Sequence, residues 1–182
     1  MFSNTKVKDG LVGPEEELQR LVISNPQPTS MPGINFPDPV FTALFVGWHA
    51  FEHFLQEKIE LRHVIDWALA LHQLSDQEAE LMNKIKRNTG WGDFCDTLTA
   101  IAIHQIDLPT KWFPKTEQIS VEQEQRLWND IIISPRTHKS KSSNFRRIYI
   151  AKRMLKNNWK YRTYSNISAS KLLIKEFVGY VK

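Results

Sequence analysis

The stretch DPVFTALFVGWHAFEHFLQEKIELRHVIDWALALH, residues 38–72, decides the fold class of this 182-residue chain. Asp38 followed by Pro39 is typical of a helix start, because an Asp side chain caps free N–H groups and proline fits the first helical position. Apolar residues then recur at steps of three and four, namely Phe41, Leu44, Phe45, Trp48, Phe51 and Leu55. This spacing predicts an amphipathic helix over about residues 39–57.

Further helices follow this first one. A second is expected over residues 60–74, with a buried face made of Leu61, Val64, Ile65, Ala68 and Leu71. Ser75 with Glu78 is a capping box for a third helix that ends near Gly90. Four more are expected, from Asp93 to the break at DLPTKWFP and over residues 121–133, 143–158 and 168–180. Because strand-like alternation is nowhere sustained, the predicted fold class is all-α, an irregular bundle of about six to seven helices.

The first 37 residues are expected to form an N-terminal arm, with an extended Pro-rich segment. GPEEELQRLVIS predicts one short helix there, and NPQPTSMPGINFPDP then places five prolines within fifteen residues. Prolines remove backbone donors, so this segment is predicted to be a connector rather than a buried element. The helical domain is expected to cover residues 38–182, with a strongly basic part over residues 136–182.

Composition limits the class of protein. No stretch approaches the roughly 18–20 apolar residues of a membrane span, and the N-terminus lacks the apolar core of a secretory signal. We therefore expect a cytoplasmic protein with no membrane partner. Cys95 is the one cysteine, which excludes an internal disulfide and a cysteine-built zinc site, and we expect it to be a buried apolar residue.

Charge is divided unevenly along the chain. Residues 1–135 contain 11 Lys and Arg against 19 Asp and Glu, whereas residues 136–182 contain 13 Lys and Arg against Glu176 alone. A basic end of this kind attracts an anion, a nucleic acid or the acidic part of the same molecule.

Two histidines of the first helix form one candidate site. His49 and His53 stand at positions i and i+4, on one face of the helix. That spacing is used for zinc, but a metal needs at least one more ligand, and the zincin motif requires Glu where this chain has Ala50. With no third ligand apparent, we expect no metal here and a pair that faces a cleft or a neighbouring helix. His72 is expected to pack against the apolar face of the second helix, and His63 to point elsewhere.

Arg62 and Asp66 are a second pair at i and i+4, on the second helix. One interpretation is an intrahelical ion pair on a solvated face, which stabilises a helix by about 0.2–0.5 kcal/mol. The other is that Asp66 orients Arg62 toward a ligand, since the planar guanidinium suits a phosphate or carboxylate.

The basic segment NFRRIYIAKRMLKNNWKYRTYS is a candidate anion-binding surface. Its cations Arg146, Arg147, Lys160 and Arg162 alternate with aromatic residues that could stack nucleic-acid bases. Alternatively, the cations are the solvated side of a helix whose other side is apolar. No glycine-rich phosphate loop or serine nucleophile elbow occurs in the chain, so no catalytic residue is assigned.

Residues 36–72 resemble the helical region of the uncharacterised nucleotidyltransferase family of Bacteroidetes. The pattern H-x-x-x-H followed by L-R-x-x-x-D-W is met by His49, His53, Leu61, Arg62, Asp66 and Trp67. The segments LTAIAIHQIDLPTKWFP and LKNNWKYRTYSN also resemble parts of that family, so the resemblance spans about residues 36–182.

The resemblance implies only the helical half of such a protein. Family members have an N-terminal α/β core in which a glycine-serine turn and an Asp-x-Asp pair hold metal and triphosphate, and no Asp-x-Asp occurs in this chain. We therefore expect no nucleotide transfer by the chain alone, no cofactor of its own, and NTP and Mg²⁺ only together with a catalytic partner chain. His49, His53, Arg62 and Asp66 would face the ligand cleft, with Arg62 toward an anionic group.

Three functions are consistent with this pattern. The first is a binding or interaction module, a degenerate relative without its own catalytic carboxylates. The second is an enzyme part that positions substrate for a nucleotidyltransferase completed by another chain. The third is a helical protein that binds nucleic acid through its basic C-terminal segment.

Overall fold

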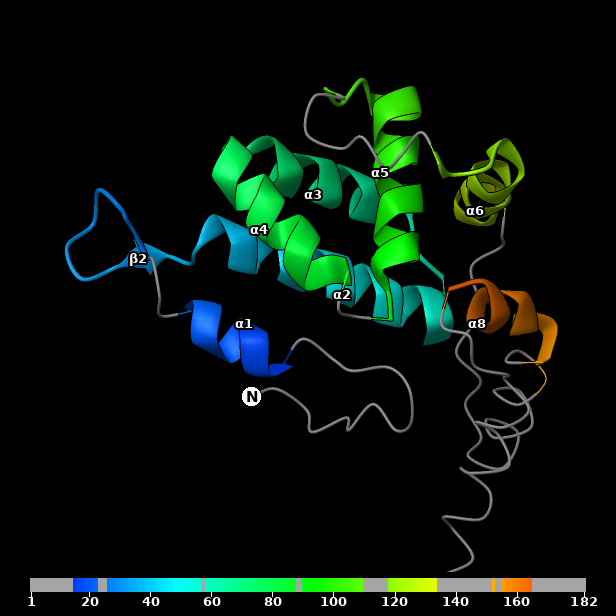
Figure 1. Cartoon of the computed structure of the whole chain (residues 1–182), viewed down its shortest axis with the longest axis horizontal. Coiled ribbons are helices and arrows are strands. Elements are labelled where there is room, and N and C mark those ends of the chain that lie inside the picture. Colours follow the sequence, from blue (N-terminus) through cyan, green and yellow to red (C-terminus); the bar gives the residue numbers. More distant parts are fainter. Residues whose placement is uncertain are drawn as a thin grey trace, which may run out of the picture.

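The computed structural model describes residues 15–22, 26–56, 58–87, 90–109, 118–133, 152 and 155–164. These residues contain seven helices and one pair of short strands (Figure 1). The helices are α1 (Glu15–Val22), α2 (Pro39–Gln56), α3 (Leu61–His72), α4 (Asp76–Arg87), α5 (Gly92–Ile106), α6 (Val121–Ile133) and α8 (Asn158–Tyr164), and the strands are β1 (Gln27–Pro28) and β2 (Asn35–Phe36).

The all-α class and the approximate number of helices are thus confirmed. The helix expected over residues 168–180 lies outside the described residues, as does most of the one expected over 143–158. Among the helices that the structure describes, none is both long and apolar enough to cross a membrane.

Local capping sets where two of the helices begin. Asp38 Oδ1 accepts the N–H groups of Val40 at 2.7 Å and Phe41 at 3.1 Å, as its position before a proline predicts. The capping box of α4 is also present, because the Ser75 N–H donates to Glu78 Oε2 at 2.8 Å. These polar contacts satisfy backbone groups that the first helical turn leaves unpaired.

Helix α2 is the centre of the bundle. It packs against α1, α3, α4, α5 and α8, while α6 covers the outer side of α5. Figure 1 shows α3 and α4 on one side of α2 and α1 on the other. The rings of Phe51 and Phe54 from α2 lie 5.2 and 5.0 Å from that of Phe94 on α5, and all three side chains are fully buried. Helix packing around these aromatic residues therefore forms one continuous core.

Helix α3 is rotated relative to the face that apolar spacing predicts. Leu61 and Ile65, expected inside, are 42% and 41% exposed, and Leu69 is 57% exposed. The buried side is formed instead by His63, Val64, Trp67, Ala68, Ala70 and Leu71. Trp67 explains why this side of α3 faces the core, because its large ring is fully buried and its Nε1–H donates to Thr99 Oγ1 of α5 at 3.0 Å.

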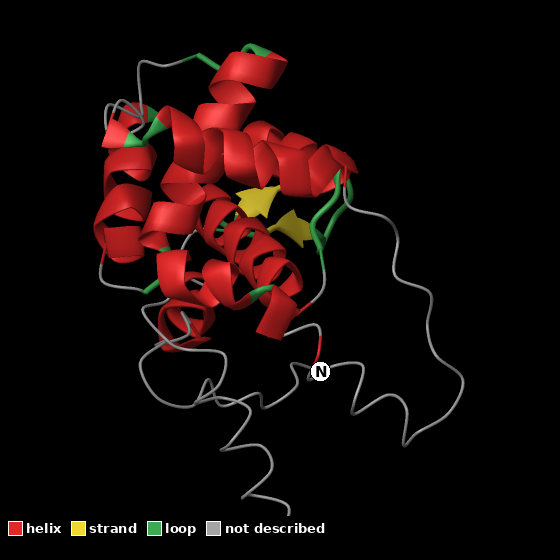
Figure 2. Ribbon diagram, turned by 90° about the vertical axis from the view of Figure 1, so that its right-hand side faces the viewer, coloured by secondary structure: helices red, strands yellow, loops and turns green. Residues whose placement is uncertain are grey.

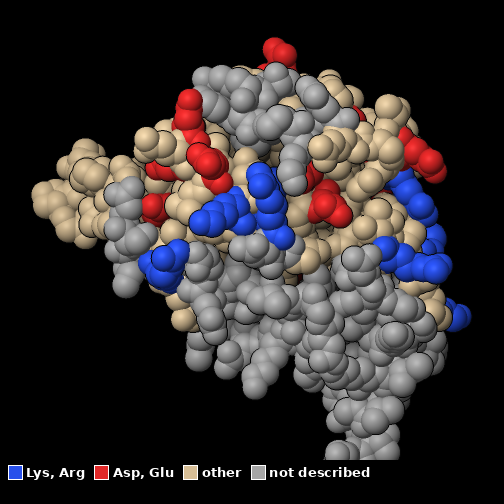
Figure 3. Space-filling view, in the orientation of Figure 1, with Lys and Arg blue, Asp and Glu red and all other residues tan. Residues whose placement is uncertain are grey.

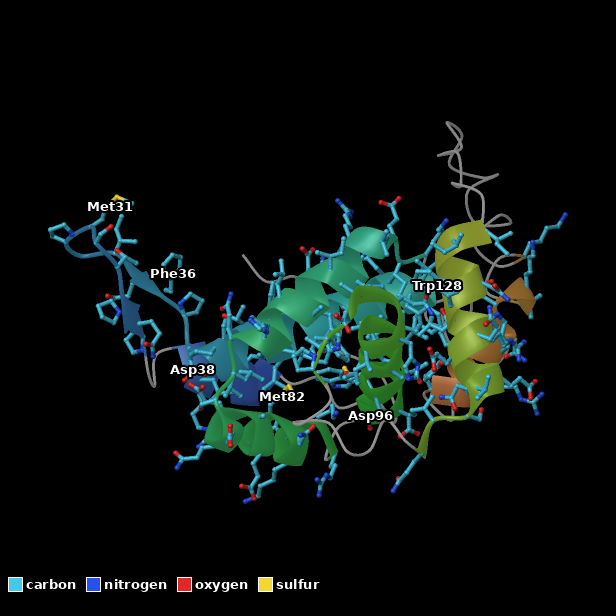
Figure 4. The ribbon with its side chains drawn as sticks, turned by 90° about the horizontal axis from the view of Figure 1, so that it is seen from above. Met31, Phe36, Asp38, Met82, Asp96 and Trp128 are labelled. Carbon is cyan, nitrogen blue, oxygen red and sulfur yellow. The ribbon has the colours of Figure 1, made fainter. Side chains whose placement is uncertain are left out.

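The Pro-rich connector forms a small hairpin, in which β1 pairs with β2 in antiparallel register. The pairing was not expected from the sequence, although the exposed, connector-like character was. In Figure 4 the side chains of Met31 and Phe36 lie far from the helical body, and Figure 3 shows the same region as a protrusion without charged side chains. In Figure 2 the two short strands (yellow) are seen between the helices (red), some of which lie in front of them in this view.

The N-terminal arm is attached to the bundle by its short helix. The helix expected within residues 13–24 is observed as α1, and Leu18 and Leu21 are buried in the core cluster. The apolar side of α1 thus packs on α2.

Cys95 lies in the core with no exposed surface, as expected, and burial raises the pKa of its thiol. Because the thiolate is the reactive form, we expect no reaction with an aromatic disulfide reagent in native buffer, and release of one equivalent per chain in denaturant. The absorbance of the released thiolate measures this. Rapid labelling of protein that circular dichroism shows to be folded would contradict the assigned burial.

Candidate functional site

The candidate site lies between α2 and α3. A pocket of about 340 Å³ opens there, lined by Thr42, Phe45, Val46 and His49 of α2, by His63, Asp66, Leu69 and Ala70 of α3, and by Gln73, the residue after α3. Two of the four residues singled out by sequence, His49 and Asp66, line this pocket. We refer to the pocket together with His53 and Arg62 as the α2–α3 face.

Three histidines meet on the α2–α3 face. The ring centroids of His49 and His53 are 4.5 Å apart, and the ring of His63 lies 6.3 Å from the first and 5.5 Å from the second. One ring nitrogen from each of the three lies within 4.8 Å of the other two. The spacing at i and i+4 identified the α2 pair, whereas the third imidazole comes from the first turn of α3.

This arrangement corrects two expectations. His63 does not point away from the pair but is 6% exposed and turned toward it, while His72, expected to be packed, is exposed. Both differences follow from the rotation of α3, since His63 shares the buried side with Trp67. Because α2 ends at Gln56 and α3 begins at Leu61, the first turn of α3 lies near the last turns of α2.

The ring of His63 is held by the backbone of Glu60. The Glu60 N–H donates to His63 Nδ1 at 3.0 Å, and the Glu60 carbonyl oxygen lies 3.3 Å from the same ring nitrogen. This nitrogen accepts a hydrogen bond in one neutral tautomer and can donate one in the other. In both cases the contact fixes the ring plane.

The environment favours the neutral form of two of these imidazoles. Burial lowers the pKa of His49, and the neighbouring His53 adds to the effect. Burial also lowers the pKa of His63, with a further contribution from the Arg62 guanidinium, although the hydrogen bond with the Glu60 backbone acts in the opposite direction. Both shifts favour the neutral imidazole over the charged imidazolium.

The intrahelical ion pair between Arg62 and Asp66, one of the two interpretations of their spacing, is not observed. The ion pair that the structure shows for Arg62 joins its Nε to Glu60 Oε2 at 3.7 Å, and its side chain is 70% exposed. Such an exposed pair contributes little to stability. Asp66 lies at the surface with its side chain on the pocket, so the carboxylate and the guanidinium have different surroundings.

Two of the four candidate anion-binding cations, Lys160 and Arg162, lie within the described residues. Lys160 is not on a solvated face, because it is 1% exposed and its Nζ donates to Asp130 Oδ2 at 2.6 Å. Arg162 is exposed in the last turn of α8, and Arg146 and Arg147 lie outside the described residues. Burial of Lys160 corrects its assignment as an anion ligand, since its charge already has an internal partner.

Trp67 of the L-R-x-x-x-D-W pattern is a core residue, whereas Arg62 and Asp66 are exposed on the same helix. The pattern therefore combines positions that pack α3 with positions that face outward.

Comparison of the chain with protein-family models, curated proteins and solved structures finds no match. The nucleotidyltransferase resemblance stays a prediction, and function is inferred from the α2–α3 face.

Proposed function

We propose that this chain is a helical binding module of nucleotidyltransferase ancestry, and that its α2–α3 face receives a nucleotidyltransferase catalytic domain. The observation that carries the proposal is the convergence of His49, His63 and Asp66 in one open pocket beside an exposed apolar stripe. Polar groups that converge in a pocket with apolar walls are typical of a ligand-binding site.

The apolar stripe supports the docking part of the proposal. Leu61, Ile65 and Leu69 stand at i, i+4 and i+8 of α3, and all three are exposed. Scattered apolar side chains are normal on a protein surface, but a row on one helix that borders a pocket matches the composition of an interface. A catalytic domain that covered this row would close the pocket and exclude water from it.

The chemistry of the face is suited to positioning a substrate rather than to nucleotide transfer alone. The chain has no Asp-x-Asp, so the metal-binding carboxylates of the reaction would come from the partner domain. Asp66 and the imidazoles of the α2–α3 face would contact the bound substrate, and the exposed guanidinium of Arg62 would meet an anionic group at its edge.

Replacement of Ile65 by Asp tests the docking surface. We expect Ile65→Asp to weaken binding to a nucleotidyltransferase catalytic domain that carries the Asp-x-Asp pair by at least about tenfold, because a central apolar contact contributes roughly 1–2 kcal/mol or more to an interface. Binding is measured by calorimetry with the purified catalytic domain in buffer that contains a metal chelator.

A matched control is available on α4. Leu81 is 40% exposed and Ile65 is 41% exposed, so Leu81→Asp introduces the same charge at a site of equal exposure. We expect Leu81→Asp to bind as the unmodified chain does. Equal affinities for both variants, or no association of the unmodified chain with the catalytic domain, would refute the proposed function.

A further inference from the structure

The three imidazoles of the α2–α3 face are arranged as ligands of a single ion. His49 and His53 approach from successive turns of α2, and His63 approaches from the first turn of α3. A ring nitrogen of each lies within 4.8 Å of the other two, although the three residues are distributed over fifteen positions of the sequence. Convergence from two helices indicates more than the incidental i and i+4 pair.

We propose that His49, His53 and His63 bind a divalent transition metal ion of the zinc type, with one coordination position open to the pocket. Neutral imidazole suits Zn²⁺, Cu²⁺, Ni²⁺ and Fe²⁺, whereas Mg²⁺ and Ca²⁺ prefer oxygen ligands. Three histidines and an open position are also the ligand set of catalytic rather than structural zinc sites. This inference goes beyond the proposed function, because the chain would bind the ion without any partner.

The geometry requires only a modest contraction. Tetrahedral zinc has Zn–N distances of about 2.0–2.1 Å, which place two ligand nitrogens about 3.3 Å apart. The side chains of His49 and His53 are exposed and half-buried, so rotation about their side-chain bonds can bring them to that separation. His63 is buried and held by Glu60, and it would act as the fixed ligand around which the other two close.

The protonation states are compatible with a metal. An imidazole must be neutral to offer a lone pair to a metal ion. The Glu60 N–H donates to His63 Nδ1 at 3.0 Å, so binding of an ion through Nε2 requires the other tautomer, in which the Nδ1 proton is donated to the Glu60 carbonyl oxygen 3.3 Å away. A backbone carbonyl that orients a ligating histidine in this way is a common feature of metal sites.

The surroundings of the site give the ion an accessible fourth ligand. The pocket that contains His49 and His63 is open and also contains Asp66, so a water molecule or an anionic group of a small ligand can reach the ion. Asp66 adds a carboxylate to the lining of the same pocket. The neutral ligand set leaves the ion its full positive charge, which favours an anion or a metal-bound hydroxide in that position.

The test is a metal titration of the untagged full chain after removal of metal by a chelator. We expect Co²⁺ to bind with one equivalent per chain and to give visible absorption bands of a four- or five-coordinate ion, and Zn²⁺ to displace it and raise the unfolding temperature. Loss of an outer contact typically reduces metal affinity about 10–100-fold, so His49→Ala and His53→Ala should each reduce it by more than about 100-fold.

Exposed histidines provide the matched controls. His72 on α3 and His104 on α5 are both exposed, and His72→Ala and His104→Ala should leave Co²⁺ affinity unchanged. His63→Ala removes a buried side chain, so its Co²⁺ affinity is interpreted only if circular dichroism shows the variant to be folded. His49→Ala and His53→Ala test the metal site without it. Absence of Co²⁺ binding, or equal loss of affinity in the controls and the α2 variants, overturns the metal site.

The proposed metal site and the proposed docking surface are tested by independent experiments, so that either can be refuted without the other. Metal binding is measured on the chain alone. Because Ile65 is not one of the three ligands, Ile65→Asp should still bind Co²⁺ although its affinity for the catalytic domain is reduced. Docking is measured in chelator, so its outcome does not depend on the ion.

Discussion

Replacement of Asp130 by Ala is expected to lower the free energy of unfolding by about 3 kcal/mol. The Lys160 ammonium is 1% exposed, and its contacts include Asp130 Oδ2 at 2.6 Å, the Phe54 carbonyl oxygen at 3.2 Å and the Phe54 ring at 4.4 Å. Removal of one partner of a buried ion pair leaves an uncompensated charge, which costs roughly 3–5 kcal/mol. Asp130 is 14% exposed, which favours the lower end of that range.

Urea denaturation followed by circular dichroism measures this change. The exposed Glu122 lies on the same helix, and Glu122→Ala should change stability by less than about 0.5 kcal/mol. In the double variant Asp130→Leu, Lys160→Met both charges are replaced by apolar side chains, and we expect most of the lost stability to return. A loss below about 1 kcal/mol in Asp130→Ala would show that Lys160 is not dependent on this carboxylate.

Local sequence signals were sufficient for most of the described helices. The cap at Asp38 and the capping box at Ser75 determine where α2 and α4 begin, and each depends on residues within four positions of one another. The boundaries of α6 were likewise visible in the polar start at Ser120 and the apolar spacing after it. Such features are encoded by neighbours along the chain, so one sequence is enough to predict them.

The orientation of α3 could not be obtained in this way. This helix has apolar side chains on both sides, with Leu61, Ile65 and Leu69 on one and Val64, Trp67, Ala68 and Leu71 on the other. The spacing of apolar residues alone does not determine which of the two sets is buried. The choice is made by contacts with α5, above all the hydrogen bond from Trp67 to Thr99, which is 32 residues away.

Only part of the candidate site could be predicted from the sequence, because it too depends on contacts between residues that are distant along the chain. His49 and His53 were identified by their spacing within α2, whereas His63 joins them through the rotation of α3. Lys160 was assigned to a solvated face because its neighbours are basic, yet its partners Phe54 and Asp130 lie 106 and 30 residues away. Residues brought together by packing between helices leave no regular pattern in the sequence.

Replacement of Gly47 by Ala is expected to destabilise the protein by about 1–3 kcal/mol, which reverses the usual preference for Ala in a helix. A Cβ atom at Gly47 would lie 2.7 Å from Cζ3 of Trp67 and 3.1 Å from Cζ3 of Trp91. Both rings are fully buried and cannot move aside easily. Glycine at this position therefore lets α3 approach α2 closely, and that approach sets the distance between His63 and the α2 histidines.

A double variant separates this steric effect from helix propensity. Trp67→Phe removes the outer ring that carries Cζ3, so Gly47→Ala should cost much less in that background and could approach the gain of about 1 kcal/mol that Ala gives over Gly in a helix. Chemical denaturation of the four proteins in the cycle measures the coupling. If Gly47→Ala has the same effect with Trp or Phe at position 67, the contact with Trp67 is not what requires glycine. If the coupling is present, Gly47→Ala should also weaken Co²⁺ binding, because it would separate α2 from the helix that carries His63.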